Sequence, residues 1–102
     1  AWTALAATLR ARGDLDEAES AARRVIEEDE EDAHGWRVLA LVAGDRADVA
    51  LAAEAWERSA RLGLDPPGAL AGLAGLRKDC LARGDTVGAA DVESRIARLR
   101  RG

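Results

Sequence analysis

Few side chains in this sequence have the types and spacing that catalysis or metal binding requires. His34 is the only histidine and Cys80 the only cysteine among the 102 residues. A nucleophilic pair needs cysteine and histidine in contact, and a zinc site needs several such ligands. We therefore predict no catalytic, metal-binding or cofactor-binding residues, and interpret His34 as a surface residue and Cys80 as a core residue. The glycines Gly68, Gly72 and Gly75 lack the Lys-Ser/Thr ending of a phosphate loop, so we expect close helix packing there.

Two runs of charge are candidates for binding. Residues 27–32 are six consecutive acids, which could hold a cation or a basic partner. They lack the central glycine of a calcium-binding loop, so we interpret them as a solvated connection between helices. The basic C-terminal end could contact a phosphate or an acidic partner, and it consists of Arg95, Arg98, Arg100 and Arg101. We interpret it as a solvated helix end whose cations suit the helix dipole.

Composition and charge argue against several function classes. The formal net charge is -4, whereas nucleic-acid-binding modules usually carry a positive excess. No apolar run approaches the roughly 20 residues that span a membrane, and no secretory signal is visible. Together with the single cysteine, this favours a cytoplasmic chain. The sequence contains no Met, which we interpret as the sign of a fragment of a longer protein.

The tetrapeptide Ala-Arg-Gly-Asp occurs twice, at residues 11–14 and 82–85. It contains an adhesion tripeptide, but an adhesion role needs an exposed, extracellular loop tip, which nothing in the sequence indicates. Apolar residues at i, i+3 and i+4 spacing run up to each Gly, and Gly ends helices because it tolerates a left-handed conformation. Asp then begins the next helix by accepting hydrogen bonds from free backbone N–H groups. We therefore interpret the tetrapeptide as a boundary between helices.

The same reasoning sets the other helix boundaries. Gly44 and Asp45 are interpreted as a third turn of this kind. The second helix of each pair is then expected at about 15–28, 46–62 and 86–100. Asp65 precedes two prolines and is expected to start another helix, and Asp32 is expected to cap the helix that contains Trp36.

Similar segments recur along the chain at a spacing of 34 residues. Trp2, Leu5 and Ala6 are matched by Trp36, Leu39 and Ala40 at that spacing. In a third copy, Leu70 keeps the spacing of 34 residues, whereas Leu73 stands at a better distance from Gly84. Both registers remain open at this point.

This pattern resembles the tetratricopeptide repeat, a unit of 34 residues with two antiparallel helices. The matching positions in the first repeat are Trp2, Leu5, Ala6, Leu9, Gly13, Ala18, Ala22 and Val25. The resemblance implies an all-α fold, a right-handed helical-hairpin solenoid of about six antiparallel helices, in a single domain over residues 1–102. Its repeats would span about 1–32, 33–66 and 67–102. Because Gly44 follows Trp36 by only eight residues, the first helix of the second repeat is expected to be cut short.

Tight packing follows from the same resemblance. Trp2 and Trp36 are expected to wedge between helices, and Ala6, Ala18 and Ala40 to lie where backbones approach closely. A larger residue at such an alanine should overpack the core at a cost of about 1–3 kcal/mol.

The resemblance also implies a function, that of a non-catalytic protein–protein interaction module. Its peptide or protein partner would bind a concave groove formed by the first helix of each pair. Carried over by position, the groove residues are Thr3, Ala7, Arg10, His34, Arg37, Leu41 and Lys78. This groove is mildly basic, so we expect an acidic or C-terminal peptide segment as ligand. The Lys and Asn of the family's carboxylate clamp are replaced here by Thr3, Ala7 and Leu41, so chaperone-tail binding of that type is not expected.

Two other interpretations compete with this one. The chain would be a structural or oligomerisation segment of a larger protein if Trp56 were exposed and anchored a self-contact. A small enzyme or cofactor binder is the third interpretation, against which the lack of a paired acid and base or an activated nucleophile argues.

Overall fold

Six helices make up the part of the chain that the structure, a computed structural model, describes. It describes residues 2–101, and for Trp2 the backbone alone. The helices are α1 (Trp2–Arg12), α2 (Leu15–Glu28), α3 (Ala33–Asp45), α4 (Val49–Arg61), α5 (Pro66–Ala82) and α6 (Thr86–Arg101). No strand occurs in this range. The predicted all-α, helical-repeat fold is confirmed.

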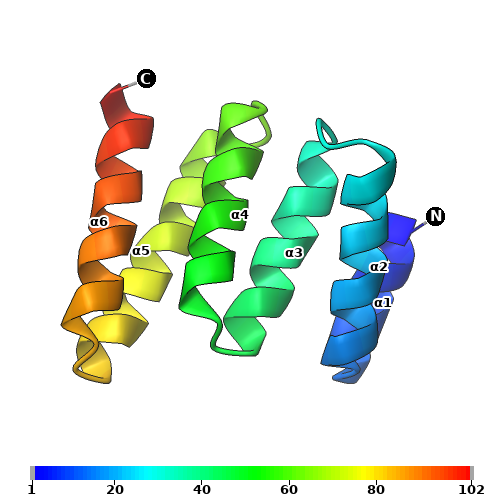
Figure 1. The fold of residues 1–102 in the computed structure, drawn as a ribbon, viewed down its shortest axis with the longest axis horizontal. Helices are drawn as coiled ribbons and strands as arrows, with labels where there is room; N and C mark the ends of the chain where they lie inside the picture. Colours follow the sequence, from blue (N-terminus) through cyan, green and yellow to red (C-terminus); the bar gives the residue numbers. More distant parts are fainter. Residues whose placement is uncertain (1, 102) are drawn as a thin grey trace.

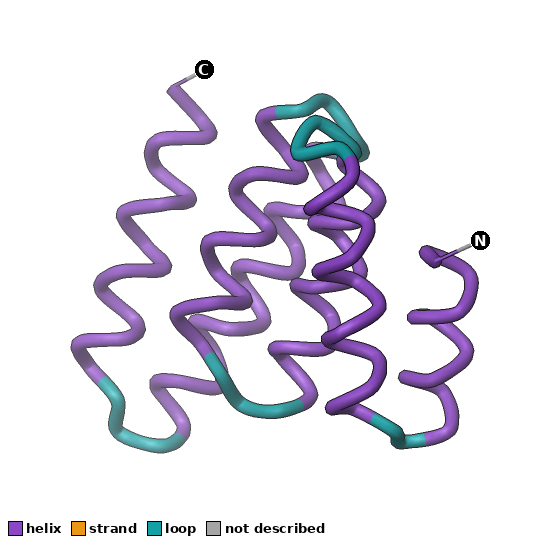
Figure 2. Tube along the Cα trace, turned by 45° about the vertical axis from the view of Figure 1, so that its right-hand side comes forward, coloured by secondary structure: helices purple, strands orange, loops and turns teal. Residues whose placement is uncertain are grey.

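The helices form three hairpins that stack in a row. Figure 1 shows α2, α3, α4 and α6 side by side, with α1 behind α2 and α5 crossing behind α4 and α6. The two ends of the chain lie at opposite ends of this row (Figure 1). The turns within the hairpins gather at one end of the helices and the connections between hairpins at the other (Figure 2). Each helix therefore runs antiparallel to the next one in the sequence.

The core is built mainly from alanine, leucine and valine. Ala6, Ala18 and Ala40 are fully buried, as the resemblance predicts for positions of close approach. The largest fully buried apolar side chains are those of Leu39, Leu73, Val42 and Val92. Small side chains let neighbouring helices approach closely, and the packing then tolerates little change in volume.

The tryptophans have different roles in this packing. The side chain of Trp2, one of the two predicted wedges, lies outside the described residues. Trp36 is half-buried against the core, and its Nε1 donates a hydrogen bond of 2.8 Å to the backbone oxygen of Glu30. Trp56 is buried, with 8% of its surface exposed, and lies against Gly72 of α5. It is therefore not the exposed anchor for self-contact that the oligomerisation interpretation requires.

The turn of the second hairpin corrects one prediction from the sequence. Gly13 and Gly84 have the expected left-handed conformation, with φ of 85° and 77°. However, Gly44 and Asp45 lie inside α3, and the left-handed residue of this turn is Ala47, with φ of 60°. Val42 and Ala43, just before Gly44, are fully buried, and their apolar contacts stabilise this end of α3 as a helix. The prediction that α3 is cut short at Gly44, with the next helix starting at residue 46, was wrong.

This turn also reveals a constant spacing. Ala47 follows Trp36 by eleven residues, as Gly13 follows Trp2. Leu73, which is fully buried, precedes Gly84 by the same interval. Counted from the turns, the third hairpin therefore places Leu73, not Leu70, at the tryptophan position.

Aspartate side chains cap four of the helices, as predicted from the sequence for three of them. Asp14 was also expected to cap a helix, but its side chain makes no capping hydrogen bond at the start of α2. The Asp32 carboxylate accepts a hydrogen bond of 3.0 Å from the backbone N–H of His34 at the start of α3. Asp65 caps α5 in the same way and is followed by Pro66. Asp48 and Asp85 cap α4 and α6. These caps fix where each of the four helices begins.

Candidate interaction site

The groove residues predicted from the sequence occupy the first helix of each hairpin. We call this set the first-helix face, and its members are Thr3, Ala7, Arg10, His34, Arg37, Leu41 and Lys78. On α1, Thr3 and Arg10 are half-buried and Ala7 is exposed. On α3, His34 and Arg37 are exposed and Leu41 is half-buried. Within each helix the residues are spaced three or four apart and so form one stripe.

An ion pair joins the stripes of α1 and α3, which pack side by side. Arg10 Nε lies 2.7 Å from Asp45 Oδ2, and Arg10 Nη2 lies 3.4 Å from Asp45 Oδ1. The bidentate pair fixes one helix against the other. It also neutralises Arg10, so the basic character of the first-helix face rests on its other cations.

His34 and Arg37 have different surroundings on α3. His34 is in the capping turn, with Nδ1 3.7 Å from Asp32 Oδ1. Arg37 lines a small hollow of about 40 Å³ between α3, α4 and the start of α5, together with Trp56 and Asp65. Arg37 makes no ion pair with the described residues. It is therefore a cation available to a ligand at the junction of two hairpins.

Lys78 lies apart from the other predicted groove residues. It is exposed on α5, and α5 packs against α4 and α6, whereas α3 packs against α1, α2 and α4. A hollow of about 240 Å³ separates the ends of α3 and α5. Its lining consists of Gly44, Ala47, Val49, Leu76, Asp79, Ala82 and Arg83. The structure thus brings the α1 and α3 stripes together and leaves α5 across a gap.

A second charged site, which the sequence analysis missed, is centred on Glu57 of α4. Its side chain is 8% exposed and accepts hydrogen bonds from three arginines. Arg61 Nη2 lies 2.8 Å from Oε2, Arg95 Nη1 lies 2.8 Å from Oε1, and Arg98 Nη2 lies 3.1 Å from Oε1. Arg95 also pairs with Asp91. The buried carboxylate of Glu57 on α4 therefore links α4 to α6, because it accepts hydrogen bonds from Arg95 and Arg98 of α6.

The electrostatics of Glu57 reflect this surrounding. Burial alone would raise the pKa of Glu57, but hydrogen bonds from Arg98, Arg61 and Arg95 and the charge of Arg98 lower it to about 2. Glu57 is thus ionised at neutral pH despite its burial. For Arg95, burial acts to lower the pKa, whereas hydrogen bonds to Asp91 and Glu57 raise it above its usual value.

A signal for this site was present in the sequence. Glu57 lies next to Trp56 and on the helix face that also carries Ala53 and Ala60, which are buried. A carboxylate on an apolar face needs a partner, and Arg61 stands one turn later. The partners from α6 could not be inferred, because only the folded hairpins bring Arg95 and Arg98 to α4.

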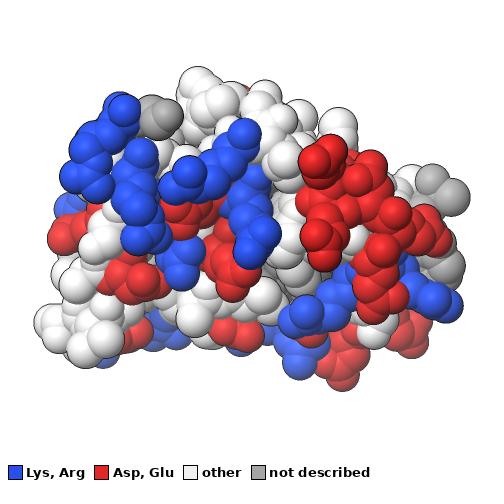
Figure 3. All heavy atoms as spheres, turned by 45° about the horizontal axis from the view of Figure 1, so that its top comes forward, with Lys and Arg blue, Asp and Glu red and all other residues white. Residues whose placement is uncertain are grey.

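Basic and acidic side chains gather on different parts of the surface. Figure 3 shows basic side chains gathered over the α4 and α6 side and acidic side chains gathered on the side of α2 and the connection to α3. Residues 27–32 supply six acids there. Arg58 of α4 lies over Trp36 of α3, with its guanidinium carbon 4.9 Å from the centre of the Trp36 ring.

Residues 2–101 provide neither a metal site nor a membrane-spanning helix. No group of three or more His, Cys, Asp or Glu side chains in this range is arranged to hold a metal ion. No helix in this range has both the length and the apolar character needed to cross a bilayer. Cys80 is fully buried in α5.

Comparison with known families is consistent with the geometry of the hairpins. Residues 1–42 match the model of the tetratricopeptide repeat family. These first 42 residues are therefore related to the tetratricopeptide repeat family. The matched segment covers α1, α2 and most of α3, which is where the tryptophan spacing and the small buried residues follow the pattern most closely. No curated protein sequence matches the chain. Tetratricopeptide repeats generally serve as protein–protein interaction modules, which makes an interaction role the natural one for this fold.

Proposed function

We propose that this chain is a non-catalytic interaction module whose first-helix face binds an acidic peptide segment of a partner protein. The observation that carries the proposal is the side-by-side packing of α1 and α3, joined by Arg10 and Asp45. This packing supports a single binding surface, on which half of the predicted residues of α1 and α3 are exposed and half are half-buried. An extended or helical peptide can lie along such a surface and contact both helices.

The charges of the face support an acidic ligand. Arg10 is neutralised by Asp45, and His34 lies near Asp32. Arg37 and Lys78 are exposed and have no ion-pair partner among the described residues. A carboxylate on the ligand would supply that partner, because opposite charges across an interface favour both association and orientation.

The test is a capture of partners from lysate of the source organism, read by mass spectrometry. The parent chain is compared with Arg37→Glu/Lys78→Glu, in which both free cations of the face are reversed. The matched control is Arg12→Glu/Arg101→Glu, which changes the charge equally at exposed helix ends away from the face. We expect a partner that the parent and the control capture and the face variant loses. If all three baits capture the same proteins, the first-helix face is not the binding surface.

A further inference from the structure

We propose a second binding site, where α4, α5 and α6 meet, for an acidic peptide that carries an aliphatic side chain. The site is a hollow of about 350 Å³ where α4 ends, α5 begins and α6 ends. We call it the arginine pocket, and its lining consists of Ala60, Arg61, Pro66, Leu70, Arg98 and Leu99. It shares no residue with the first-helix face and does not depend on the function proposed for that face.

The shape of the pocket follows from the start of α5. Asp65 adopts a left-handed conformation, with φ of 43°, and caps the helix through the backbone N–H of Gly68. The chain turns sharply there, so Pro66 stands at the rim and Leu70 follows one turn later. Leu70 and Leu99 are both half-buried, and Leu99 packs against the core. An opening with an apolar floor therefore remains between three helix ends.

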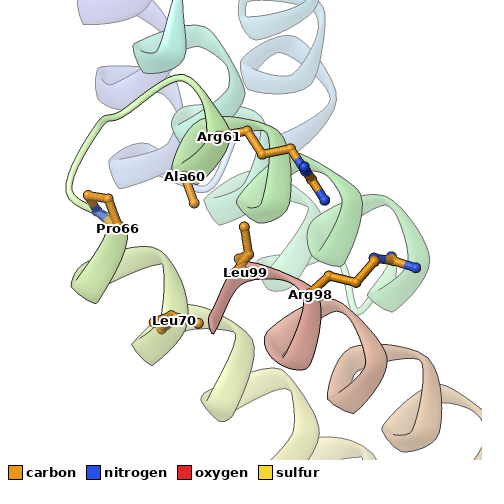
Figure 4. A pocket seen from close by; sticks show the side chains of 6 residues that line it. All are labelled: Ala60, Arg61, Pro66, Leu70, Arg98 and Leu99. Atoms are coloured by element: carbon orange, nitrogen blue, oxygen red, sulfur yellow. The ribbon is translucent and has the colours of Figure 1, made fainter. Parts of the chain in front are cut away.

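One side of the pocket is polar and positively charged. Figure 4 shows Ala60, Pro66, Leu70 and Leu99 around the hollow, with the guanidinium groups of Arg61 and Arg98 extending to the same side of it. Both guanidinium groups bond to Glu57 through Nε and Nη2. The Nη1 group of each is left without a partner among the described residues. Two donors thus remain beside an apolar hollow.

The excess of positive charge is built into the site. Arg61, Arg95 and Arg98 share the single carboxylate of Glu57, and only Arg95 has a further partner, Asp91. The side chains of Arg61 and Arg98 are 55% and 45% exposed, so a ligand can reach them. Because Glu57 already holds both guanidinium groups, little side-chain entropy is lost when a ligand carboxylate binds.

These features select one kind of occupant. An apolar hollow of this size lies at the lower end of the range of ligand pockets, which is about 300–1,000 Å³. It accommodates a leucine-like side chain, while neighbouring carboxylates of the same peptide pair with Arg61 and Arg98. A basic peptide is repelled by the same arginines, and a peptide without an aliphatic side chain leaves the apolar floor uncovered.

The test uses nuclear magnetic resonance of the ¹⁵N-labelled chain titrated with the blocked peptide Asp-Glu-Leu-Glu-Asp. We expect saturable shifts of the backbone amides of Ala60, Leu70 and Leu99. Two control peptides replace either the leucine by glycine or the four acids by lysine, and each should bind at least about tenfold more weakly. Shifts confined to α1 and α3 would overturn the arginine pocket and leave the first-helix face intact. Equal binding of the lysine peptide would also overturn the proposal.

Variants of the pocket separate its two components. Arg61→Gln removes one cation but leaves Glu57 with two arginines, and it should weaken binding by about tenfold. The matched control Arg101→Gln removes the same charge from the nearby end of α6 and should weaken binding by less than about twofold. Leu70→Trp fills the hollow without a change of charge and should abolish the shifts. It keeps the test decisive if Arg61→Gln does not fold, as judged by circular dichroism.

Two further outcomes count against the proposal. If the parent and Leu70→Trp bind the peptide equally, the hollow is not the site. If the same amides shift with chain concentration alone, and the mass in solution rises with them, a second copy of the chain occupies the pocket instead of a partner.

Discussion

The indole of Trp56 lies directly against the backbone of Gly72, so that a methyl group at Gly72 would stand 2.5 Å from Cε2 of the ring. Gly72→Ala should therefore force α4 and α5 apart. Overpacking costs about 1–3 kcal/mol, whereas alanine gains at most about 1 kcal/mol over glycine in a helix. We expect a net loss of about 1 kcal/mol or more in the free energy of unfolding, measured by urea denaturation.

Gly75 of the same helix is the matched control for this substitution. A methyl group there would meet nothing within 4 Å. Gly75→Ala should therefore raise stability by up to about 1 kcal/mol. If both variants were more stable than the parent, this result would contradict the close contact between Trp56 and Gly72.

Glu57 should make the free energy of unfolding depend on pH in the acidic range. The pKa of Glu57 in the folded chain is about 2, below its usual value of 4.5, so its contribution to stability is complete above pH 4.5 and is lost as pH falls toward 2. A shift of this size corresponds to a contribution on the order of 3 kcal/mol. Stability of the parent should fall between about pH 5 and pH 2, and Glu57→Gln should remove that part of the fall.

The control for Glu57 is Glu54, which pairs with Arg58 on the surface of the same helix. Glu54→Gln should change stability by less than about 1 kcal/mol at neutral pH, because exposed ion pairs contribute little. Glu57→Gln should cost about 2 kcal/mol or more, because it leaves three arginines around an uncharged group. Urea denaturation at several pH values measures both effects. Identical pH profiles for the two variants would show that Glu57 is not the buried centre of the cluster.

Ala47 and Gly13 should respond in opposite ways to exchange of alanine and glycine. Both are left-handed turn residues, and this conformation costs a non-glycine residue about 1–2 kcal/mol. Ala47→Gly should raise stability by up to about 1 kcal/mol, since the greater freedom of glycine in the unfolded chain offsets part of the gain. Gly13→Ala should lower it by a similar amount. Melting temperatures that move in the same direction in both variants would contradict the equivalence of the two turns.

Ala40 tests how closely the second hairpin packs. It is fully buried in α3, so Ala40→Leu should overpack the core and cost about 1–3 kcal/mol. Such a loss would lower the melting temperature by about 4–8 °C or more in a domain of this size. Ala90 of α6 is exposed and is the control, because leucine there meets solvent. A parent-like melting curve for Ala40→Leu would contradict this packing.

Local signals in the sequence predicted most of the helices. The helix predicted at about 15–28 spans Leu15–Glu28, because a left-handed glycine precedes it and its apolar residues follow helical periodicity. Asp32 and Asp65 were recognised as caps from the residues that follow them. The turn at Ala47 was misplaced because Gly44-Asp45 carries a stronger local turn signal, which tertiary contacts of α3 override.

Contacts between helices were harder to predict than the helices. The glycine cluster was expected to allow close packing, and Gly72 does so, but nothing in the sequence pointed to Trp56 as its neighbour. The basic C-terminal end was interpreted as solvated, whereas Arg95 and Arg98 hold a buried carboxylate from α4. The groove residues stay a prediction. Long-range pairs of this kind depend on how hairpins stack, which the periodicity of a single helix does not encode.

The most direct test of the interaction role is the affinity of a captured partner segment, measured by titration calorimetry. The parent, Arg37→Glu/Lys78→Glu and the control Arg12→Glu/Arg101→Glu are compared under the same salt conditions. We predict that reversal of Arg37 and Lys78 weakens binding at least about tenfold, while the control weakens it less than about twofold. Equal affinities for all three chains, or an equal loss in both variants, would contradict a binding site on the first-helix face.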